Sequence, residues 1–456
     1  MSQSPLLERF LKKVEDRSAR LGVVGLGYVG LPLAVVAAEK GFPCLGLDVS
    51  PEVVDGIKAG RSHVQDLPQE RLRPLVEEGS LQATLDFSRL GQCDAVSICV
   101  PTPLNKIKDP DLSYVVEAGR QISRHLKPGH LIVLESTTFP GTTREVLLEV
   151  LETSGKKAGE DFFLCYSPER VDPGNRIWNA GNTPKVMGGL SDDCLQAGLS
   201  LYQEIFDEMV PVSSPEAAEL TKVYENTYRM INIALANELA QVCDRLQVDV
   251  WEVIEAAATK PFGFMKFTPG PGLGGHCVPV DPHYLSWKMR ALSFKTRMIE
   301  LASEINSEMT AFVVRKVADA LNLESKPVRG SKILVVGAAY KPDVDDLRES
   351  PALEILRRLQ EMGAQIAYHD PHIPEIETAA FGWPQPCTLR SREISQTALE
   401  SYDAAVIVTH HSAIDYQLLL DHSGLVVDTR GVTRRMSGRA RVVTLGGRES
   451  RKEGQR

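Results

Sequence analysis

The sequence predicts an α/β protein in which two parallel-sheet domains are joined by a central helical region. Three observations point to this fold class. A short apolar stretch at residues 21–24 runs into a glycine-rich turn and then into a segment of helical composition. The same order of apolar strand, glycine turn and helix returns from residue 332. Between the two halves, no Gly or Pro interrupts residues 216–246, which are rich in Ala, Glu and Leu.

Length and composition indicate a globular chain of several domains. The 456 residues are 43% hydrophobic and 24% charged, and the net charge of -9 argues against a general nucleic-acid surface. The eight Cys form no C-x-x-C pair, and no apolar run suits a signal peptide or a membrane span, so we expect a reducing, cytoplasmic compartment. The expected parts are a helical lead-in (1–20), a first sheet domain (21–212), a helical domain (213–325), a second sheet domain (326–445) and a disordered tail (446–456).

The first glycine turn has the pattern of a dinucleotide site. It reads Gly25-Leu26-Gly27-Tyr28-Val29-Gly30. The turn stands between a predicted strand and a predicted helix at 31–40, and a second strand ends in Asp48. Such glycines let a pyrophosphate approach the helix N-terminus, while the acid accepts from a ribose 2′-OH and repels a 2′-phosphate. The pattern predicts a Rossmann-like domain that binds NAD rather than NADP.

Further predicted strands at 94–100, 131–134 and 162–166 are followed by polar residues. Parallel sheets bind ligands beyond the carboxyl ends of their strands. Thr102, Ser136 and Thr137 are therefore candidate cofactor contacts, although each is equally suited to cap a helix. Glu169 and Arg170 follow the last of these strands as an adjacent acid and base, which is also the pattern of an ordinary surface pair.

The central helix, predicted at 215–246, presents polar side chains on one face. Lys222, Asn226 and Arg229 fall at i, i+4 and i+7, so they point to the same side. A solvated stripe has the same spacing, but Asn226 is followed by an apolar run. We expect this helix and a second one at 296–323 to bridge the sheet domains and to offer an apolar face for a homodimer.

The second half repeats the strand order of the first without a complete G-x-G-x-x-G. Its helix is predicted at 351–361, and its strands at 332–337, 365–369, 404–409 and 425–428. Lys341, Arg348 and Arg430 follow strands of this half, and basic groups at strand ends suit a pyrophosphate or a ribose. We interpret it as a Rossmann-like domain that binds a different nucleotide.

Between the two halves, a loop rich in Gly and Pro carries Cys277. Residues 269–282 read PGPGLGGHCVPVDP. A thiol on such a shaped loop, with Asp281 four residues on, suits nucleophilic catalysis. A buried, inert cysteine beside a turn is the plainer alternative.

Histidine pairs do not predict a metal site in this sequence. His410 with His411, and His369 with His372, are the pairs that suggest one. Neither pair has a companion carboxylate or Cys at ligand spacing, so we expect no metal.

Together these motifs resemble the UDP-glucose/GDP-mannose dehydrogenase superfamily over about residues 19–443. The resemblance rests on Gly25-Leu26-Gly27-Tyr28-Val29-Gly30, Val100-Pro101-Thr102-Pro103, Glu135-Ser136-Thr137, Ser167-Pro168-Glu169-Arg170, Lys222 with Asn226, Gly274-Gly275-His276-Cys277-Val278-Pro279-Val280-Asp281, and Lys341 with Arg348-Glu349-Ser350-Pro351. The Gly-Gly-His-Cys and Ser-Pro-Glu-Arg-Val forms are most similar to the branch acting on UDP-N-acetylhexosamines, above all to bacterial UDP-N-acetylglucosamine 6-dehydrogenases. Val280 and Pro173 depart from the glucose type, which has Lys and Glu there, and count against UDP-glucose.

The resemblance implies an NAD-dependent, four-electron oxidation of a sugar C6 hydroxymethyl to a carboxylate, feeding bacterial surface polysaccharide synthesis such as that of lipopolysaccharide. Cys277 would add to the aldehyde as a thiohemiacetal, whose oxidation gives a thioester that water hydrolyses. UDP-N-acetylglucosamine is the expected substrate. The alternatives are UDP-N-acetylmannosamine, UDP-N-acetylgalactosamine or UDP-glucose, a two-electron hydroxyacid-type dehydrogenase, and a non-catalytic nucleotide-sugar sensor.

Roles for individual residues also follow from the resemblance. Lys222 and Asn226 would stabilise the oxyanion, Asp281 and Thr137 would position or deprotonate the water, and Glu169 is a second candidate base. NAD contacts are implied for Gly25, Leu26, Gly27, Tyr28, Val29, Gly30, Asp48, Thr102, Ser136, Thr137 and Arg348. Substrate contacts are implied for Glu169, Arg170, Val171, Lys222, Asn226, Arg229, Gly270, Gly274, Tyr340, Lys341 and Arg430.

Overall fold

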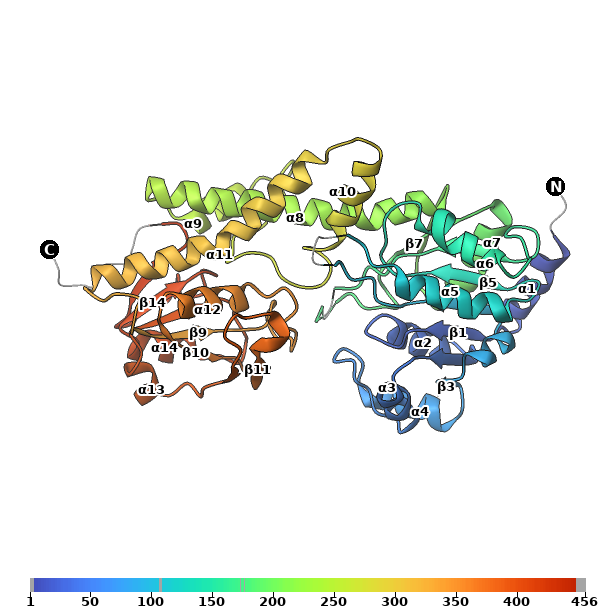
Figure 1. The fold of residues 1–456 in the computed structure, drawn as a ribbon, viewed down its shortest axis with the longest axis horizontal. Coiled ribbons are helices and arrows are strands. Elements are labelled where there is room, and N and C mark those ends of the chain that lie inside the picture. Colours follow the sequence, from blue (N-terminus) through green and yellow to red (C-terminus); the bar gives the residue numbers. More distant parts are fainter. Residues whose placement is uncertain (1–3, 106–108, 173, 176, 448–456) are drawn as a thin grey trace. The chain divides into compact units, whose positions relative to one another are not determined.

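The computed structural model describes residues 4–105, 109–172, 174–175 and 177–447. The chain divides into two compact units, of which the first comprises Met1–Glu225 with His283–Lys295 and the second Asn226–Pro282 with Thr296–Arg456 (Figure 1). The five-part division expected from the sequence therefore stays a prediction. Most of the predicted tail, from residue 448 on, lies outside the described residues.

The first unit is built on an eight-stranded sheet in the order β3-β2-β1-β4-β5-β6-β7-β8. Its strands are β1 (Leu21–Val24), β2 (Cys44–Leu47), β3 (Leu81–Thr84), β4 (Ala95–Ile98), β5 (Leu131–Leu134), β6 (Phe163–Tyr166), β7 (Lys185–Gly189) and β8 (Met209–Val212). All neighbouring strands pair in parallel except β6 and β7. The order from β3 to β6 is that of a doubly wound dinucleotide-binding sheet.

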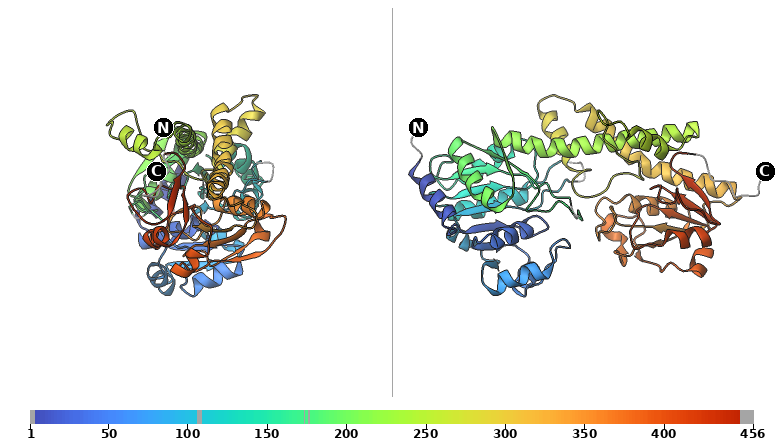
Figure 2. Two further views of the ribbon diagram at one scale, coloured as in Figure 1. Left: turned by 90° about the vertical axis from the view of Figure 1, so that its left-hand side faces the viewer. Right: turned by 180° about the vertical axis from the view of Figure 1, so that it is seen from behind.

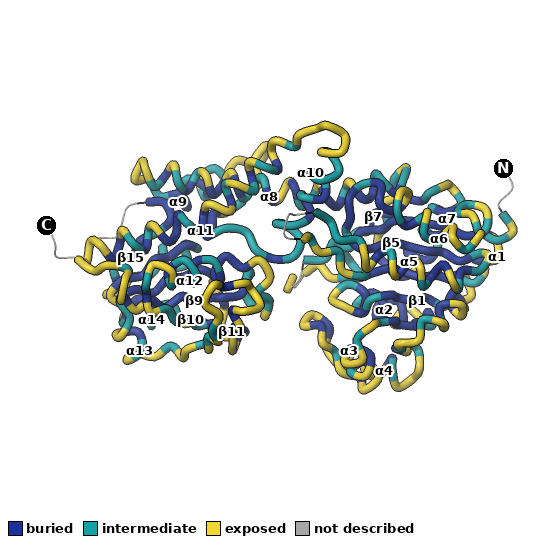
Figure 3. The backbone as a smooth tube through the Cα atoms, viewed as in Figure 1, coloured by how far each residue is buried: buried dark blue, intermediate teal, exposed yellow. Residues whose placement is uncertain are grey.

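Helices cover both faces of this sheet. They are α1 (Pro5–Glu15), α2 (Gly30–Glu39), α3 (Pro51–Lys58), α4 (Gln69–Glu77), α5 (Ser113–His125), α6 (Leu148–Glu152) and α7 (Asp192–Ile205). Because successive strand residues point to opposite faces, Val23 joins an apolar cluster under α1, α2 and α7, while Val24 joins another under α5 and α6. The inner strands, β1, β2, β4, β5, β6 and β7, are buried on both sides, as the dark tube in Figure 3 shows, whereas the edge strands β3 and β8 are partly exposed.

The second unit contains a smaller, fully parallel sheet in the order β10-β9-β13-β14-β15. Its strands are β9 (Lys332–Val336), β10 (Gln365–His369), β13 (Ala404–Ile407), β14 (Leu425–Asp428) and β15 (Arg441–Thr444). A separate antiparallel pair joins β11 (Glu375–Glu377) to β12 (Thr388–Arg390). The helices of this part are α12 (Pro351–Glu361), α13 (Gln396–Glu400) and α14 (Tyr416–His422).

Four helices lie between the two sheets in sequence. They are α8 (Pro215–Leu246), α9 (Val250–Ala257), α10 (Asp281–Ala291) and α11 (Arg297–Leu323). In the second unit α8 and α11 lie side by side (Figures 1 and 2), where Asn237 donates to Asn306 at 2.9 Å. Phe312 and Val313 of α11 share one buried cluster with Ile333 and Val335 of β9. In the part of the chain that the structure describes, no helix combines the length and the apolar character needed to cross a bilayer.

Candidate active site

The glycine turn between β1 and α2 leaves the N-terminus of α2 without a side-chain cap. Gly25 has φ +90°, and a Cβ on it would lie 2.7 Å from the carbonyl oxygen of Cys99. A Cβ on Gly30, the first residue of α2, would overlap the carbonyl oxygen of Gly25. A Cβ on Gly27 would meet nothing within 4 Å. The start of the helix therefore adjoins open space, where its N–H groups and dipole suit a pyrophosphate.

Asp48 holds this turn from the end of β2. Its Oδ2 accepts from the amide of Leu26 at 2.8 Å, and its Oδ1 accepts from the amide of Ser50 at 2.9 Å. Asp48 is half-buried, and each carboxylate oxygen has a second lone pair. It can therefore fix the turn and still accept from a ribose hydroxyl, so the turn and its acid fit NAD.

Thr102 and Ser136 join the ends of neighbouring strands beside this turn. The Ser136 hydroxyl donates to the carbonyl of Val100 at 2.7 Å, and the Thr102 hydroxyl donates to the carbonyl of Thr137 at 2.7 Å. The hydroxyl of Tyr284, on α10, donates to the carbonyl of Thr102. Both Thr102 and Thr137 are half-buried, and their hydroxyl oxygens can still accept.

Glu169 is fixed by a buried ionic network that the sequence did not predict. Its Oε1 accepts from the amides of Arg170 and Val171 at 2.7 and 2.8 Å, and its Oε2 lies 3.4 Å from Lys185 Nζ. Lys185 also donates to Glu135 at 2.6 Å, and Tyr202 donates to the other oxygen of Glu135 at 2.5 Å.

The network keeps Glu169 ionised. Burial by itself would raise the pKa of Glu169, but the charge of Lys185 and the two amide donors outweigh it and lower that pKa. Burial likewise would lower the pKa of Lys185, but Glu135 and Glu169 raise it. The sequence gives little sign of this arrangement beyond a lysine at the first position of β7, since Lys185 and Glu135 are 50 residues apart.

Other predicted residues of the first unit lie around Glu169. The Arg170 guanidinium pairs with Glu225 at 2.5 Å and donates to the carbonyl of Pro184 at 2.7 Å. Lys222, on α8, is 7% exposed, and its charge further lowers the pKa of Glu169. Val171 contributes its amide to Glu169.

In the second unit, Cys277 lies on the irregular loop that its Gly and Pro residues predict. Cys277 and Cys387 are half-buried, whereas the other six cysteines are buried. The carbonyl of Cys277 accepts from the amides of Val280 and Asp281 at 3.0 and 2.8 Å. Asp281 starts α10 and accepts from the side-chain amide of Asn226 at 2.6 Å. Hydrogen bonds thus link the backbone at the thiol, a buried carboxylate and a side-chain amide.

The glycines of the Cys277 loop are needed because Tyr340 packs against them. A Cβ on Gly275, which has φ +88°, would lie 2.7 Å from the Tyr340 ring. On Gly274 a Cβ would lie 2.7 Å from the Cβ of Tyr340. The amide of Gly275 also donates to the carbonyl of Arg348 at 2.9 Å. The Cys277 loop is therefore shaped by the segment that follows β9.

A desolvated cation lies beside the same loop. Arg430 donates from Nε to the carbonyl of Val408 at 2.7 Å, and a Cβ on Gly270 would lie 2.5 Å from its Nη1. Burial lowers the pKa of Arg430 to about 10, against the charge of Asp428, so the group stays cationic at neutral pH. Its Nη atoms donate to none of the described residues, which suits an anionic ligand.

The remaining predicted residues of this unit differ in exposure. The Arg348 guanidinium is bound by Asp346 at 2.7 to 3.0 Å and is exposed. Lys341 is half-buried, and Arg229 is exposed on α8. The predicted site residues therefore form two local groups: the glycine turn, Asp48, Thr102, Ser136, Thr137, Glu169, Arg170, Val171 and Lys222 in the first unit, and Asn226, Arg229, Gly270, Gly274, Cys277, Asp281, Tyr340, Lys341, Arg348 and Arg430 in the second.

Three family models match successive parts of the chain. Those of the UDP-glucose/GDP-mannose dehydrogenase family match with the NAD binding domain at residues 19–206, the central domain at 216–308 and the UDP binding domain at 334–435.

Known proteins with similar sequences and structures differ in the sugar they are named for. UDP-N-acetyl-D-glucosamine 6-dehydrogenase from Pseudomonas aeruginosa is 36% identical over 359 residues, which cover 78% of this chain and 84% of that protein. NDP-N-acetyl-D-galactosaminuronic acid dehydrogenase from Ralstonia nicotianae is 34% identical over 429 residues, covering 90% and 96%. The solved UDP-D-ManNAc dehydrogenase from Pyrococcus horikoshii superimposes with a TM-score of 0.84 at 31% identity, over 94% of this chain and 99% of that one. The chain therefore belongs to the UDP-glucose/GDP-mannose dehydrogenase family and is an NAD-dependent nucleotide-sugar dehydrogenase.

Proposed function

We propose that this enzyme oxidises the C6 hydroxymethyl of a UDP-N-acetylhexosamine to a carboxylate, with UDP-N-acetylglucosamine as the first candidate substrate. The observation that carries the proposal is the Cys277 loop, where a half-buried thiol is joined through its backbone to Asp281 and Asn226. A dehydrogenase that stops at the aldehyde has no use for a nucleophile, whereas oxidation to the acid requires one. The sugars for which the relatives are named support the acetamido class.

The proposed reaction passes through two covalent species on Cys277. Bound NAD+ accepts a hydride in each of two oxidation steps. The C6 alcohol first loses a hydride and a proton to give the aldehyde, to which the thiolate adds through a new C–S bond, and the oxygen takes up a proton. The thiohemiacetal loses a second hydride and a proton to become a thioester. Water then attacks, the C–S bond breaks and the thiolate leaves. Per sugar, the products are one carboxylate, two NADH and three protons.

The oxyanion of both covalent species would be stabilised by Lys222 and Asn226, which are four positions apart on α8. The fixed amide of Asn226 and the burial of Lys222 support this role, because preorganised donors need no reorientation during the reaction. Glu169, ionised and fixed by Lys185, is suited to accept a proton during thioester hydrolysis. Asp281 and Thr137 would position the attacking water.

The ligands are assigned to the two local groups. In the first unit the glycine turn, Asp48, Thr102, Ser136 and Thr137 would hold NAD. In the second, Gly270, Gly274, Tyr340, Lys341 and Arg430 would hold the UDP part, supported by the desolvated Arg430 guanidinium. Arg170, Val171 and Arg229 would contact the sugar, and Arg348 would contact NAD.

A homodimer through the central helices is part of the proposal. Tyr228 and Leu235 of α8 and Phe264 and Met265 beyond α9 are 41 to 62% exposed and line one apolar groove. Light scattering of the purified protein should give twice the chain mass, and Leu235→Glu should shift it to a monomer. A monomeric wild-type protein would refute the proposed dimer but would not affect the proposed reaction.

The decisive experiment measures NADH formed per sugar at completion, with UDP-N-acetylglucosamine, its manno and galacto epimers and UDP-glucose in parallel. Two NADH per sugar with one preferred epimer support the proposal and identify the substrate. One NADH per sugar means that the reaction ends at the aldehyde. No NADH with any of the four sugars would point to a different nucleotide sugar or to the nucleotide-sugar sensor.

Cys277→Ser tests the covalent role directly, and Cys387→Ser is its matched control because Cys387 is the other half-buried cysteine. Cys277→Ser should abolish turnover to the acid, while Cys387→Ser should leave it unchanged. Lys222→Ala should lower kcat about 10²–10³-fold, the effect of losing one oxyanion donor. Acid formation by Cys277→Ser at the wild-type rate would rule out the thioester route.

A further inference from the structure

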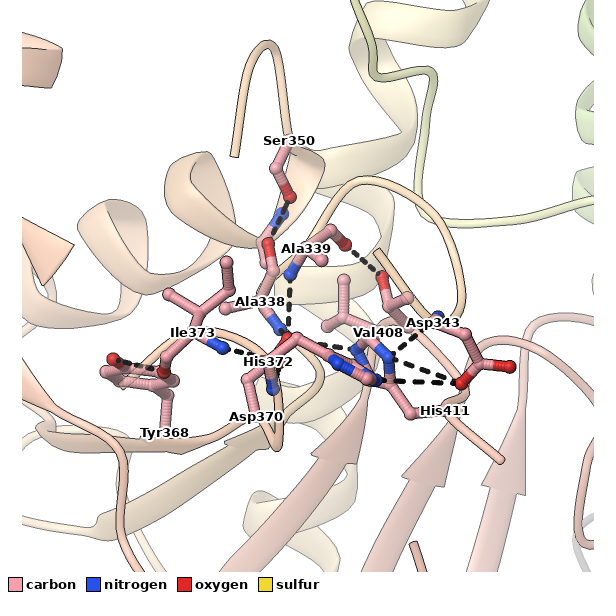
Figure 4. Close-up of polar contacts among 12 residues, drawn as sticks. Ala338, Ala339, Asp343, Ser350, Tyr368, Asp370, His372, Ile373, Val408 and His411 are labelled. Atoms are coloured by element: carbon pink, nitrogen blue, oxygen red, sulfur yellow. Dashed lines mark hydrogen bonds and ion pairs between the residues drawn. The ribbon is translucent and has the colours of Figure 1, made fainter. Parts of the chain in front are cut away.

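Three side chains that the proposed reaction does not use converge at one edge of the second sheet (Figure 4). Asp343 lies in the loop after β9, His372 follows β10 and His411 follows β13. Asp343 Oδ1 is 3.8 Å from His372 Nε2 and 3.9 Å from His411 Nδ1, and the imidazole rings are 5.0 Å apart. One potential ligand atom from each residue lies within 4.8 Å of the other two.

The tautomer of His411 is fixed by its neighbours. His411 Nε2 lies 2.9 Å from Asp370 Oδ2, and His411 Nδ1 accepts from the amide of Asp343 at 3.0 Å. Asp370 Oδ2 also accepts from the amides of Ala338 and Ala339 at 2.7 and 2.9 Å. Because Nδ1 accepts from an amide and Nε2 faces an acceptor oxygen, the His411 proton is on Nε2 and the Nδ1 lone pair points toward Asp343. A histidine backed by a carboxylate in this way is the usual form of a metal-ligating histidine.

His372 supplies an independent sign of a missing ligand. Its Nε2 is buried and has no hydrogen-bond partner among the described residues. Leaving a buried polar nitrogen unsatisfied is unfavourable, and such an atom calls for a water or an ion. Asp343 Oδ1 lies 3.8 Å from this nitrogen and also accepts from the amide of Ser412 at 2.8 Å.

We propose that Asp343, His372 and His411 bind a divalent transition-metal ion, with zinc as the physiological candidate. Two imidazoles and one carboxylate favour Zn²⁺ or Co²⁺ over Mg²⁺ or Ca²⁺, and three protein ligands leave a position for water. Ligand atoms around zinc at about 2.0–2.1 Å stand about 3.3 Å apart. Asp343 Oδ1 must therefore approach each imidazole nitrogen by about half an ångström, and the two nitrogens, which lie within 4.8 Å of one another, must approach by up to about 1.5 Å. The ion would replace the hydrogen bond from the Asp343 amide to His411 Nδ1.

The ion would act on the loop between β9 and α12 rather than on the chemistry. Asp343 has φ +61°, a left-handed conformation that Asp adopts more readily than most residues. The same loop carries Tyr340, which shapes the Cys277 loop, and Arg348. Metal binding would fix this loop to the ends of β10 and β13 and stabilise the second unit by mass action.

The test is titration of tag-free, chelator-treated full-length protein with Co²⁺ and Zn²⁺. We expect one equivalent of Co²⁺ to bind, with visible d–d bands typical of a low coordination number and no sulfur charge-transfer band. Zn²⁺ should displace the bound Co²⁺, and either ion should raise the melting temperature. Wild-type protein that binds no stoichiometric Co²⁺ or Zn²⁺ overturns the proposal. A sulfur charge-transfer band that disappears in Cys277→Ser also overturns it, because the ion is then on the catalytic thiol.

Two substitutions that preserve the fold test the ligands. Asp343→Asn keeps an acceptor for the Ser412 amide and suits the left-handed backbone, and His372→Ala removes a half-buried ring. Each should weaken Co²⁺ binding at least about tenfold, the low end for loss of a metal-site partner. His410→Ala is the matched control, since His410 adjoins His411 but is exposed and outside the cluster. Unchanged affinity in both Asp343→Asn and His372→Ala would assign the ion to another site.

Discussion

Each of the two large sheets has a glycine turn after its first strand and an aspartate that binds this turn, but the surroundings of the two aspartates differ. In the first, Gly25 has φ +90° and its amide donates to the carbonyl of Leu47 at 2.8 Å. In the second, Gly337 has φ +85° and its amide donates to the carbonyl of His369 at 2.8 Å. Asp48 Oδ2 accepts from the amide after Gly25, and Asp370 Oδ2 accepts from the amide after Gly337. Both sheets therefore place an acid at the same position of the turn.

The environments of these two acids differ. Asp48 accepts from two amides and remains half-buried. Asp370 is 2% exposed and accepts from four amides, those of Ala338, Ala339, His372 and Ile373, and from His411. An acid with spare lone pairs toward solvent can take a ribose hydroxyl, whereas one enclosed by donors can only hold the fold. The acid of the first turn is therefore available for the proposed ribose contact, whereas the acid of the second turn is structural.

The following helix differs as well. In the first sheet α2 begins at Gly30, immediately after the turn, with no side-chain cap. In the second, α12 begins only at Pro351, and Ser350 caps it by accepting from the amide of Ala352 at 3.3 Å. The capped helix has fewer free N–H groups to offer an anion, which is consistent with the proposed role of the Arg430 side chain as an anion contact in this unit.

The largest expected effect is on folding, in Asp370→Ala. Removing this carboxylate leaves buried hydrogen-bond donors without an acceptor. We therefore expect the free energy of unfolding to fall by about 3–5 kcal/mol, as when one partner of a buried ionic pair is removed. The loss is measured by urea unfolding in the presence of a chelator. Hydrogen exchange of the β9 and β10 amides reports the unfolding of the second unit during this experiment. Asp48→Ala is the counterpart and should change unfolding by less than about 1 kcal/mol. Equal losses of unfolding free energy in Asp370→Ala and Asp48→Ala would contradict the expected difference between the two acids.

The buried acid Glu219 of the first unit can be compared with Asp370 by its effect on the pH dependence of stability. Glu219 accepts from the amide and hydroxyl of Thr143 at 2.8 and 2.7 Å and from the amide of Gly141 at 2.5 Å. Burial raises the pKa of Glu219 to about 7, because three donors do not offset desolvation as the donors around Asp370 do. The folded-state pKa lies above the unfolded value, so the stabilisation is complete below pH about 4 and is lost as pH rises through about 7.

The predicted size of this pH effect is roughly 3 kcal/mol between pH about 4 and 8. Wild-type protein should lose free energy of unfolding in the first unit across that range, whereas Glu219→Gln should show a flatter profile. Glu219→Gln should also be less stable at low pH, because its amide NH₂ cannot accept from Gly141. Identical pH profiles for the two proteins would contradict the raised pKa.

Asp48→Ala should weaken NAD binding by about 10–100-fold, corresponding to about 1.5–3 kcal/mol for a hydrogen bond to a charged group. The ratio of NADP to NAD affinity should rise, since the acid no longer repels a 2′-phosphate. Calorimetric titration with both cofactors measures these changes, and Asp55→Ala, an exposed acid on α3, is the control. NAD affinity that stays at the wild-type value would remove Asp48 from the cofactor site.

The smallest expected effect is at the cap of α12. Ser350→Ala should cost about 1 kcal/mol, the usual effect of losing a helix N-cap. Its hydroxyl also donates to the carbonyl of Ala338 at 2.6 Å, so the substitution should also destabilise the turn after β9. Urea unfolding of this variant beside wild type is the measurement. A gain in stability would mean that the cap is strained rather than favourable.

The sequence by itself determined the parts of this protein whose signals are local. The strand, glycine turn and helix around Gly25 are read from neighbouring residues, and the predicted helix at 215–246 has the bounds of α8. The irregular loop at Cys277 follows from its Gly and Pro content. Backbone conformation depends mainly on residues close along the chain, which is why these elements could be predicted.

Only the tertiary structure decided which charged groups meet. Lys185 and Glu135 are separated by 50 residues, and His411 and Asp370 by 41. The sequence suggested no metal because neither histidine pair has a companion carboxylate or Cys at ligand spacing, yet folding brings Asp343 to His372 and His411. Parallel strands are connected through helices, so their carboxyl ends meet at one edge of a sheet although their residues are far apart in the chain. Spacing along the sequence cannot show such contacts.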